Sequence, residues 1–208
     1  MTAWVIVPVK SLVDGKSRLA EVLSPARRRR FNENALSHVI ATVCDGFDAA
    51  HRLVVSGCAE TRRFAEVLGA AVIDEPPGGG LNRAVECARD HALARDAERI
   101  LVISSDLPLV TAIELRAVRE SAPGAAAVIC RDRHGSGTNA LFLTRPSGFH
   151  FAFGEDSAAA HRAEAERLGL TPVMMDLAGI GFDIDTPADL EVLESSPIIE
   201  EKSLGARR

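Results

Sequence analysis

The chain has few cysteines, and no two of them stand at a metal-binding spacing. Cys44, Cys58, Cys87 and Cys130 are scattered along the sequence, and no C-x-x-C pair occurs. Zinc sites and dithiol redox sites built on such pairs are therefore excluded. We interpret the four cysteines as structural thiols in a reducing compartment, and we expect a cytoplasmic protein.

The chain also lacks an excess of positive charge and a long apolar run. Its formal net charge is -5 at pH 7, whereas broad binding to nucleic acid or to a membrane surface favours a basic face. No apolar run approaches the roughly 18 residues of a membrane span. The first residues carry no basic region before Pro8, so we expect no signal peptide. We expect small-molecule partners, and neither nucleic acid nor a membrane; the sequence leaves a homodimer open.

What is present is the composition of one globular domain. The 208 residues are 47% hydrophobic and 25% charged, and a chain of this length can bury about 70% of its unfolded surface. We expect a single domain over 1–208, with a core over about residues 3–193 and a loose tail over 195–208. Apolar runs predict strands, and helical spacing and capping signals predict helices. The expected strands are 3–9, 52–56, 71–73, 100–103, 126–130, 140–143 and 173–176, and the expected helices are 25–44, 60–68, 81–94, one from the Thr111 cap, 156–168 and 186–193. This alternation predicts an α/β fold, with a mostly parallel central sheet and helices on both faces.

One carboxylate follows the strand that we place at the centre of this sheet. The run Ile100–Ile103 is typical of a strand buried on both faces. Asp106 comes just after it, and Pro108 cannot continue a central strand. Asp106 is therefore predicted at the carboxyl edge of the sheet, where open α/β sheets bind ligands.

Two further carboxylates are predicted at a similar edge. If Phe182 and Ile184 face one way in an extended segment, Asp183 and Asp185 both face the other way. Together with Asp106 they would supply three oxygen ligands, and Mg²⁺ takes one or two carboxylates together with substrate phosphates. Aspartates are also common in turns and at helix caps, so the spacing alone leaves both interpretations open.

Three cations cluster in the loop after the first strand. Lys10, Lys16 and Arg18 accompany Gly15, whose missing side chain would let the backbone approach a ligand. The match to a P-loop is incomplete, because Lys10 stands where that motif requires a glycine. Three cations on a negatively charged protein suggest a polyphosphate partner, and an ordinary solvated loop is the alternative.

Other glycine-rich stretches offer polar groups to a ligand. Gly80 and Asn82 precede or open a helix and suit a nucleobase or ribose, although a plain connector explains them equally. The stretches 135–139 and 154–157 each place glycine beside a hydroxyl, and the second opens a helix, so its backbone N–H groups and Ser157 could hold a phosphate. N-capping alone would also explain the second stretch. We expect His134 and His161 to be hydrogen-bonding surface residues.

Taken in order, these stretches resemble the guanylyltransferase family of coenzyme F-420 biosynthesis, whose archaeal members act on 2-phospho-L-lactate. The resemblance spans about residues 3–193. The matching stretches are Val7–Lys10 with Gly15–Leu19, Leu81–Ala84, Ser105–Pro108, Gly137–Leu141, Phe153–Ser157 and Asp183–Pro187.

This resemblance implies a compact, GT-A-like (Rossmann-like) nucleotidyltransferase fold and transfer of GMP from GTP to a phosphorylated three-carbon acid, with release of pyrophosphate. The acceptor would be phosphoenolpyruvate, 2-phospho-L-lactate or 3-phospho-D-glycerate. The implied cofactor is Mg²⁺, or Mn²⁺ in its place. The implied roles are metal binding by Asp106, Asp183 and Asp185; catalysis by Asp106, Lys16 and Arg18; nucleotide binding by Lys10, Lys16, Arg18, Gly80 and Asn82; and acceptor binding by Thr138, Asn139, Gly154 and Ser157.

Two other functions stay open at this point. The chain could be a nucleotidyltransferase for molybdopterin or a sugar phosphate, although its compact length and the stretch Gly137–Asn139 argue against this. It could also be a domain that senses GTP without catalysis. The sequence has both the metal ligands and the acceptor-binding stretches 135–139 and 154–157, which argues against a degenerate site.

Overall fold

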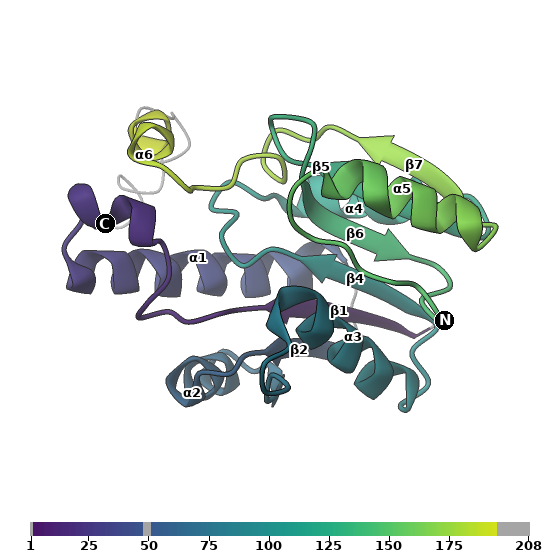
Figure 1. Ribbon diagram of the computed structural model, residues 1–208, viewed down its shortest axis with the longest axis horizontal. Helices are drawn as coiled ribbons and strands as arrows, with labels where there is room; N and C mark the ends of the chain where they lie inside the picture. The colour runs from purple at the N-terminus through teal and green to yellow at the C-terminus, as the bar shows by residue number, and fades with distance from the viewer. Residues whose placement is uncertain (1, 48–50, 195–208) are drawn as a thin grey trace.

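A seven-stranded sheet forms the centre of the protein in a computed structural model that describes residues 2–47 and 51–194 (Figure 1). The strands are β1 (Ala3–Pro8), β2 (His51–Val55), β3 (Ala71–Ile73), β4 (Arg99–Ile103), β5 (Ala126–Arg131), β6 (Thr138–Leu143) and β7 (Thr171–Met175). The helices are α1 (Pro25–Gly46), α2 (Ala59–Val67), α3 (Gly80–Leu93), α4 (Ala112–Glu120), α5 (Ser157–Arg167) and α6 (Pro187–Glu194), with a 3-10 helix η1 (Ser17–Glu21). The predicted alternation of strands and helices is confirmed; the predicted tail over 195–208 lies outside the described residues.

The sheet is mostly parallel and has a point where its order reverses. The strand order is β3-β2-β1-β4-β6-β5-β7. Only β6 runs against its neighbours, since it pairs antiparallel with β4 and β5, while the other pairings are parallel. The chain moves outward from β1 to β3 and then returns to place β4 on the other side of β1. Ligands bind at the carboxyl ends of strands at such a switch point.

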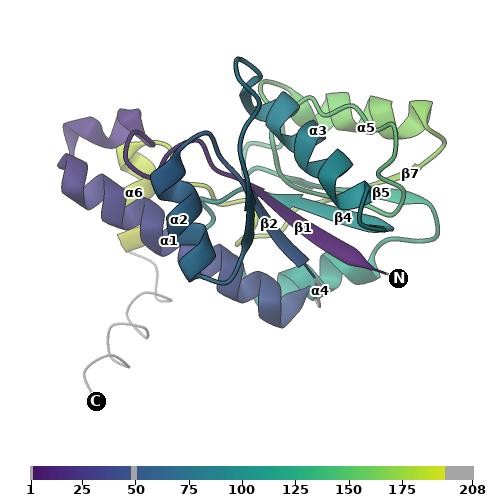
Figure 2. The same cartoon turned by 90° about the horizontal axis from the view of Figure 1, so that it is seen from below.

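Helices cover both faces of the sheet (Figure 2). On one face α1, α2 and α4 pack their apolar side chains around Val5, Val7 and Leu101. On the other face α3 and α5 pack around Ile6 and Val102. Alternate residues of the central strands therefore supply two separate cores, which explains why these strands are apolar on both sides.

Capping chemistry at the helix ends agrees with the sequence. The Ser24 side chain accepts the N–H of Arg27 at the start of α1. Thr111 and Glu114 form the predicted capping box of α4. The segment after Ile180 differs from the simplest expectation, because residues 182–185 form no strand in the sheet. Ile184 is nevertheless buried, while its neighbours Asp183 and Asp185 are partly exposed.

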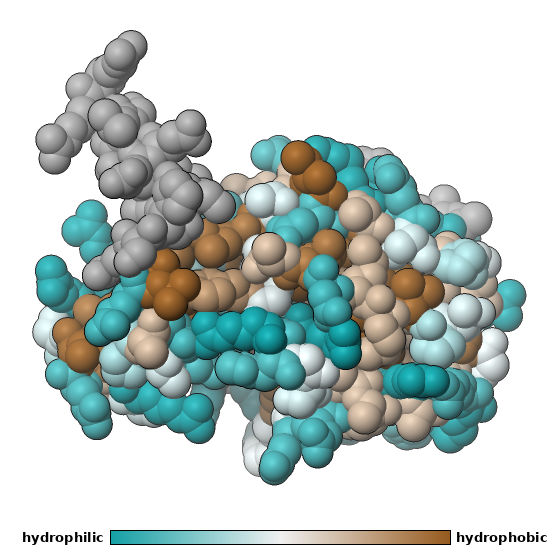
Figure 3. Space-filling view, turned by 90° about the horizontal axis from the view of Figure 1, so that it is seen from above, coloured by the Kyte–Doolittle hydropathy of each residue, from teal (hydrophilic) through white to brown (hydrophobic). Residues whose placement is uncertain are grey.

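Apolar residues are dispersed over the one face of the molecular surface that the space-filling view shows. On the face shown in Figure 3, strongly apolar residues lie in separate groups among hydrophilic ones. No helix among the residues that the structure describes is both long enough and apolar enough to cross a membrane.

Candidate active site

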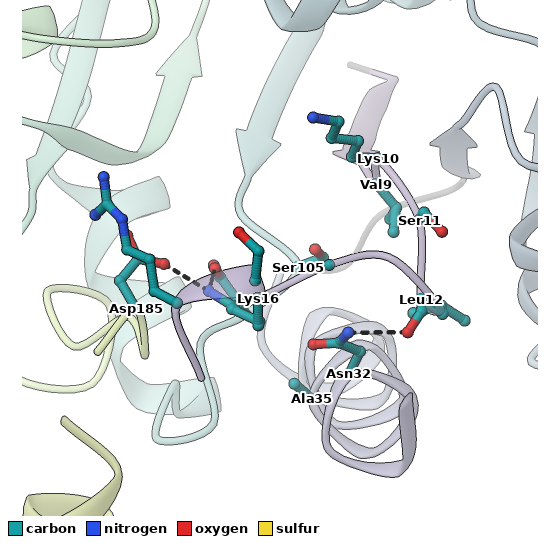
Figure 4. A pocket seen from close by; sticks show the side chains of 13 residues that line it. Val9, Lys10, Ser11, Leu12, Lys16, Asn32, Ala35, Ser105 and Asp185 are labelled. Atoms are coloured by element: carbon teal, nitrogen blue, oxygen red, sulfur yellow. Dashed lines mark hydrogen bonds and ion pairs between the residues drawn. The ribbon is translucent and has the colours of Figure 1, made fainter. Parts of the chain in front are cut away.

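A cavity of about 350 Å³ opens at the switch point, beyond the carboxyl ends of β1 and β4. The loop after β1 forms most of its wall, and Ser105 and Asp106 after β4 and Asp185 from the C-terminal loop complete it. Figure 4 shows Lys16 and Asp185 on one side of this cavity and Lys10 on the other. The structure thus brings together cations and carboxylates that the sequence separates by up to 169 positions.

The ammonium group of Lys16 lies between two of the predicted metal ligands. Its Nζ atom contacts Oδ2 of Asp106 and lies 2.8 Å from Oδ1 of Asp185. Burial opposes the charge on the lysine, but the two carboxylates outweigh burial and raise the pKa of Lys16. Asp106 is held in turn by the Ser104 hydroxyl, which donates to its Oδ1 atom. The position between Asp106 and Asp185 therefore favours a cation.

Asp183 lies close to this pair but has a different partner. Its Oδ1 atom accepts from Nδ2 of Asn139 at 3.2 Å. Burial raises the pKa of Asp183, the Asn139 contact opposes that change, and the nearby charges of Asp106 and Asp185 raise it further. Within residues 2–47 and 51–194, however, no group of three or more carboxylate, thiol or imidazole side chains is arranged to hold a metal ion. In this arrangement the lysine ammonium, rather than Asp183, joins the other two carboxylates.

Two carboxylates, the buried Asp189 and the partly buried Glu114, fix the loop that carries Asp183 and Asp185, and the sequence analysis did not identify either of them as a support for this loop. Asp189 Oδ2 accepts the backbone N–H groups of Asp185 at 2.8 Å and Thr186 at 2.7 Å. Glu114 accepts the N–H of Gly179 at 2.6 Å. A Cβ at Gly179 would lie 2.2 Å from the Leu109 carbonyl, so the loop needs glycine there. The stretch Thr186–Asp189, which has the pattern of a helix N-terminus, was the available signal for the role of Asp189.

The role of Gly15 differs from the expected one. A Cβ at Gly15 would lie 2.7 Å from the carbonyl oxygen of Ser11, so glycine allows the loop to close on itself. Asn32 of α1 supports the same loop by donating to the Leu12 carbonyl at 2.9 Å. The loop then enters η1 through Lys16, whose φ of 59° is left-handed. This geometry differs from a P-loop, in which the lysine lies at the start of an α-helix.

Two cations of the loop are available to a ligand. Lys10 and Arg18 are exposed, line the cavity and have no ion-pair partner among the described residues. Lys16, in contrast, is 10% exposed and doubly paired. The cavity therefore offers unpaired positive charge beside an acidic pair, which is the electrostatic pattern of a metal–polyphosphate site.

The predicted acceptor residues gather beside the acidic cluster. Because β6 runs antiparallel to β4, its first residues lie at the carboxyl edge of β4, and Ser104 donates its N–H to the Asn139 carbonyl at 2.9 Å. Ala158 at the start of α5 donates to the Ser136 carbonyl at 2.9 Å, which joins this helix to the loop before Thr138. Thr138 and Ser157 are both buried, and Gly154 has a φ of 136° that favours glycine.

The start of α5 differs from the expected phosphate site in its details. The N–H groups of Ser157 and Ala158 are already bonded, to the carbonyls of Gly154 and Ser136. Asp156 does not cap the helix through its side chain; instead its backbone is left-handed, with a φ of 52°. The hydroxyls of Thr138 and Ser157, rather than these two amides, are the groups left for a ligand.

Asn82 and His161 also differ from expectation. Both polar atoms of Asn82 bond the main chain of Phe153, at 2.7 Å and 3.1 Å. Asn82 therefore connects α3 to residues 149–156 before α5, which we call the acceptor loop, instead of standing free for a base. Gly80 is exposed with a φ of 66°.

His134 is exposed as expected, but the prediction for His161 was wrong, since it is fully buried. Its position four residues after Ser157, among the inward-facing alanines of α5, was the available signal.

Known sequences and structures that resemble this chain identify its family and its fold. The phosphoenolpyruvate guanylyltransferase of Sphaerobacter thermophilus is 39% identical over 93% of this chain and 93% of its own length. The 2-phospho-L-lactate guanylyltransferase of Methanothermobacter thermautotrophicus is 31% identical over 91% of this chain and 83% of its own length.

Solved structures share the fold at low identity. A nucleotide-diphospho-sugar transferase from Desulfovibrio desulfuricans superposes with a TM-score of 0.74 at 17% identity, over 94% of this chain and 87% of that one. A manganese complex of Rv0371c from Mycobacterium tuberculosis superposes with a TM-score of 0.57 at 17% identity, over 94% of this chain and 100% of that one. The expected nucleotidyltransferase fold is thereby confirmed. The model of the family described as "Guanylyl transferase CofC like" matches residues 3–195, and the chain belongs to this guanylyl transferase family.

Proposed function

We propose that this protein transfers GMP from GTP to a small phosphorylated three-carbon acid and releases pyrophosphate, as a step in coenzyme F-420 biosynthesis. The observation that carries the proposal is the cavity at the switch point. Lys10 and Arg18, which have no ion-pair partner within residues 2–47 and 51–194, lie there beside the acidic pair joined by Lys16. Relatives named for phosphoenolpyruvate and for 2-phospho-L-lactate support this substrate class.

The triphosphate of GTP would occupy the cationic side of the cavity. Lys10, Lys16 and Arg18 would neutralise its charge, and Arg18 can bind two phosphate oxygens at once. The exposed Gly80 at the start of α3 would face the nucleoside, with Asn82 holding the neighbouring loop in place. The bond from Asn82 to Phe153 would thus connect the nucleotide side of the site to the acceptor loop.

The negative charge of the acidic cluster suits a divalent cation once Lys16 has moved to the phosphates. Asp106 and Asp185 already share one positive group, the Lys16 ammonium, and two carboxylates with substrate phosphates are the usual protein ligands of Mg²⁺. We propose that Asp106, Asp183 and Asp185 hold Mg²⁺ or Mn²⁺ when the nucleotide binds. Such an ion would supply charge neutralisation at the phosphates. The manganese complex of the structural neighbour supports a role for divalent metal.

The chemical step needs alignment and charge neutralisation more than proton transfer. A phosphate oxygen of the acceptor attacks the α-phosphorus of GTP and forms the new P–O bond, while the bond to the bridging oxygen of the β-phosphate breaks and pyrophosphate leaves with the electron pair. A phosphate monoester has a second pKa of about 6, so it is already ionised at neutral pH and needs no general base. Lys16 and Arg18 would stabilise the negative charge that builds on pyrophosphate. Thr138, Asn139, Gly154 and Ser157 would position the acceptor and its surroundings.

Pyrophosphate release measures the proposed activity directly. The purified protein is incubated with each nucleoside triphosphate, with Mg²⁺ or Mn²⁺, and with phosphoenolpyruvate, 2-phospho-L-lactate or 3-phospho-D-glycerate. We expect release with GTP and at least one of these acids, and none when the acid is omitted. Release with a sugar phosphate only, or binding of GTP without release under any condition, would contradict the proposal.

A further inference from the structure

His161 makes two hydrogen bonds from a fully buried position in α5. Its Nδ1 atom lies 3.0 Å from Oγ1 of Thr138, and its Nε2 atom lies 3.0 Å from the backbone nitrogen of Ala152. The ring packs edge-on against Phe153, with 4.7 Å between the ring centres. The imidazole therefore joins β6, α5 and the acceptor loop at one point.

The partner of Nε2 determines which nitrogen carries the proton. A backbone N–H can only donate, so Nε2 accepts from Ala152 and carries no hydrogen. Burial lowers the pKa of His161 to about 4, against a smaller opposing effect of the Glu164 charge, so the ring is neutral at physiological pH. A neutral imidazole has one N–H. The proton must therefore be on Nδ1, which donates to Thr138.

The tautomer in turn determines what the Thr138 hydroxyl can do. Its oxygen accepts from His161, so its own hydrogen must be donated to another group. No acceptor for this hydrogen occurs in the part of the chain that the structure describes, and Thr138 retains 9% exposure at the sheet edge. Ser157 lies one helical turn before His161, on the same face of α5. The Thr138 hydroxyl can therefore donate its hydrogen to a ligand that binds beside Ser157.

We propose that His161 is a positioning residue, which commits the Thr138 hydroxyl to donate to an oxygen anion of the acceptor acid, either its phosphate or its carboxylate. This inference rests on the proposed function and deepens it, because it assigns the Thr138 hydroxyl of the acceptor site the role of hydrogen-bond donor only. A hydroxyl that can only donate selects a group that only accepts. An ionised phosphate or carboxylate satisfies this condition, whereas an alcohol or amide in the same place could also donate.

Two substitutions at position 161 distinguish the hydrogen bond to Thr138 from the hydrogen bond to Ala152. The amide nitrogen of asparagine takes about the place of Nδ1 and can donate to Thr138, whereas the amide oxygen of glutamine takes about the place of Nε2 and can accept from Ala152. We expect His161→Gln to raise the KM for the acceptor about tenfold with little change in the KM for GTP. His161→Asn should recover most of that loss. Equal acceptor KM values for His161→Gln and the wild type would overturn the proposal.

A double-mutant cycle tests whether His161 acts through Thr138. Thr138→Val removes the hydroxyl, and Thr138→Ser keeps it. If the two residues act as one unit, adding His161→Gln to Thr138→Val raises the acceptor KM no further. Additive effects would show that His161 acts on its own. Thr144→Val is the matched control, because the Thr144 hydroxyl bonds Ala126 just beyond the far end of β6; it should leave both KM values unchanged.

Two binding probes distinguish the anionic groups of the acceptor. Inorganic phosphate and the unphosphorylated acid lactate are each titrated as inhibitors against the wild type and His161→Gln. Weaker inhibition of the variant by phosphate alone assigns the Thr138 donor to the phosphate group, and weaker inhibition by lactate alone assigns it to the carboxylate. If neither probe distinguishes the two proteins, the hydroxyl binds no acceptor anion and the proposal fails.

Nitrogen NMR of the imidazole tests the inference without any measurement of activity. We expect a neutral ring with its proton on Nδ1 at pH 7, and the same state at pH 5. A proton on Nε2 would overturn the inference even in an active enzyme. Conversely, a wild-type protein that releases no pyrophosphate with any acid refutes the proposed function, while the NMR result still decides the tautomer.

Discussion

Nζ of Lys16 lies 2.8 Å from Oδ1 of Asp185 and also contacts Asp106, although these carboxylates lie 169 and 90 positions away from it in the chain. The ammonium supplies the positive charge that keeps two neighbouring carboxylates from repelling each other. A divalent cation in the same place would free Lys16 for the phosphates of the nucleotide. If the proposed metal binds here, Lys16 and the metal would compete for one position until the nucleotide gives the lysine another partner.

Replacement of Lys16 by methionine should reveal this competition. Without the ammonium, Asp106 and Asp185 face each other with no cation between them, so the variant should bind Mn²⁺ more tightly than the wild type when nucleotide is absent. Calorimetric titration with Mn²⁺ measures the affinity, and pyrophosphate release from GTP should fall at least tenfold because the triphosphate loses a positive charge. An affinity for Mn²⁺ equal to or weaker than that of the wild type would contradict the competition.

Asp106→Asn should lower turnover by orders of magnitude and leave the fold intact. The amide keeps the size of the side chain and a contact for the Ser104 hydroxyl, but it removes the charge that a metal and Lys16 both need. Turnover is measured by pyrophosphate release, and folding by circular dichroism and thermal unfolding. Release at a near-normal rate would remove Asp106 from the catalytic centre.

Asp189→Ala should impair the site without touching any substrate. The change leaves the N–H groups of Asp185 and Thr186 without their shared acceptor, which costs about 1–3 kcal/mol in the free energy of unfolding. Turnover should fall as Asp185 loses its fixed position. Arg133→Met is the matched control, because it removes the other partner of Asp189 and keeps both amide bonds. If this control lowers turnover as much as Asp189→Ala, the ion pair rather than the amide bonds is what matters.

Ser157→Ala should raise the KM for the acceptor more than the KM for GTP. Ser157 lies at the start of α5, where Ala158 joins the helix to the loop before Thr138, and it does not line the cavity that holds the cationic loop. The side chain is almost fully buried, so the variant should differ from the wild type mainly in its hydroxyl. Steady-state kinetics with each substrate varied in turn provides the test. Equal increases in both KM values would place Ser157 outside the acceptor site.

The depressed pKa of His161 predicts a pH-dependent stability. The ordinary value of 6.5 applies to the unfolded chain, and burial lowers the pKa to about 4 in the fold. Between these values the unfolded chain binds a proton that the folded chain does not, so the free energy of unfolding decreases as the pH falls from 6.5 to about 4, by up to about 3 kcal/mol. A protonated ring would also direct a second N–H at the N–H of Ala152.

Urea unfolding of the wild type and His161→Asn at pH 7 and pH 4.5 measures this effect. The variant lacks the titrating ring, so the stability difference between the two proteins should change in favour of the variant at the lower pH. The change in that difference is the quantity to compare, since other carboxylates titrate in both proteins alike. A difference that is the same at both pH values would contradict the depressed pKa.

The sequence alone predicted most of the fold, because the relevant signals are local. Runs such as Ile100–Ile103 have the pattern of a strand buried on both faces, and Thr111 with Glu114 is a capping box that needs no distant partner. The same local patterns, together with the order of the motifs, indicated the family and named the residues of the cavity and the acceptor loop. Hydrophobic periodicity and capping depend on residues a few positions apart, so they can be recognised without a structure.

Only the tertiary structure decided how those residues are used. The structure pairs Lys16 with Asp106 and Asp185 and bonds Asn82 to the main chain of Phe153, and no local pattern indicated these contacts. The roles of Lys16 and Asn82 at the nucleotide stay predictions. His161 was expected at the surface, yet it is buried and hydrogen-bonds Thr138. Each of these roles depends on which donors and acceptors the sheet order and its one antiparallel strand bring within about 3 Å, and hydrogen-bond partners at that range are set by packing in three dimensions rather than by neighbours in sequence.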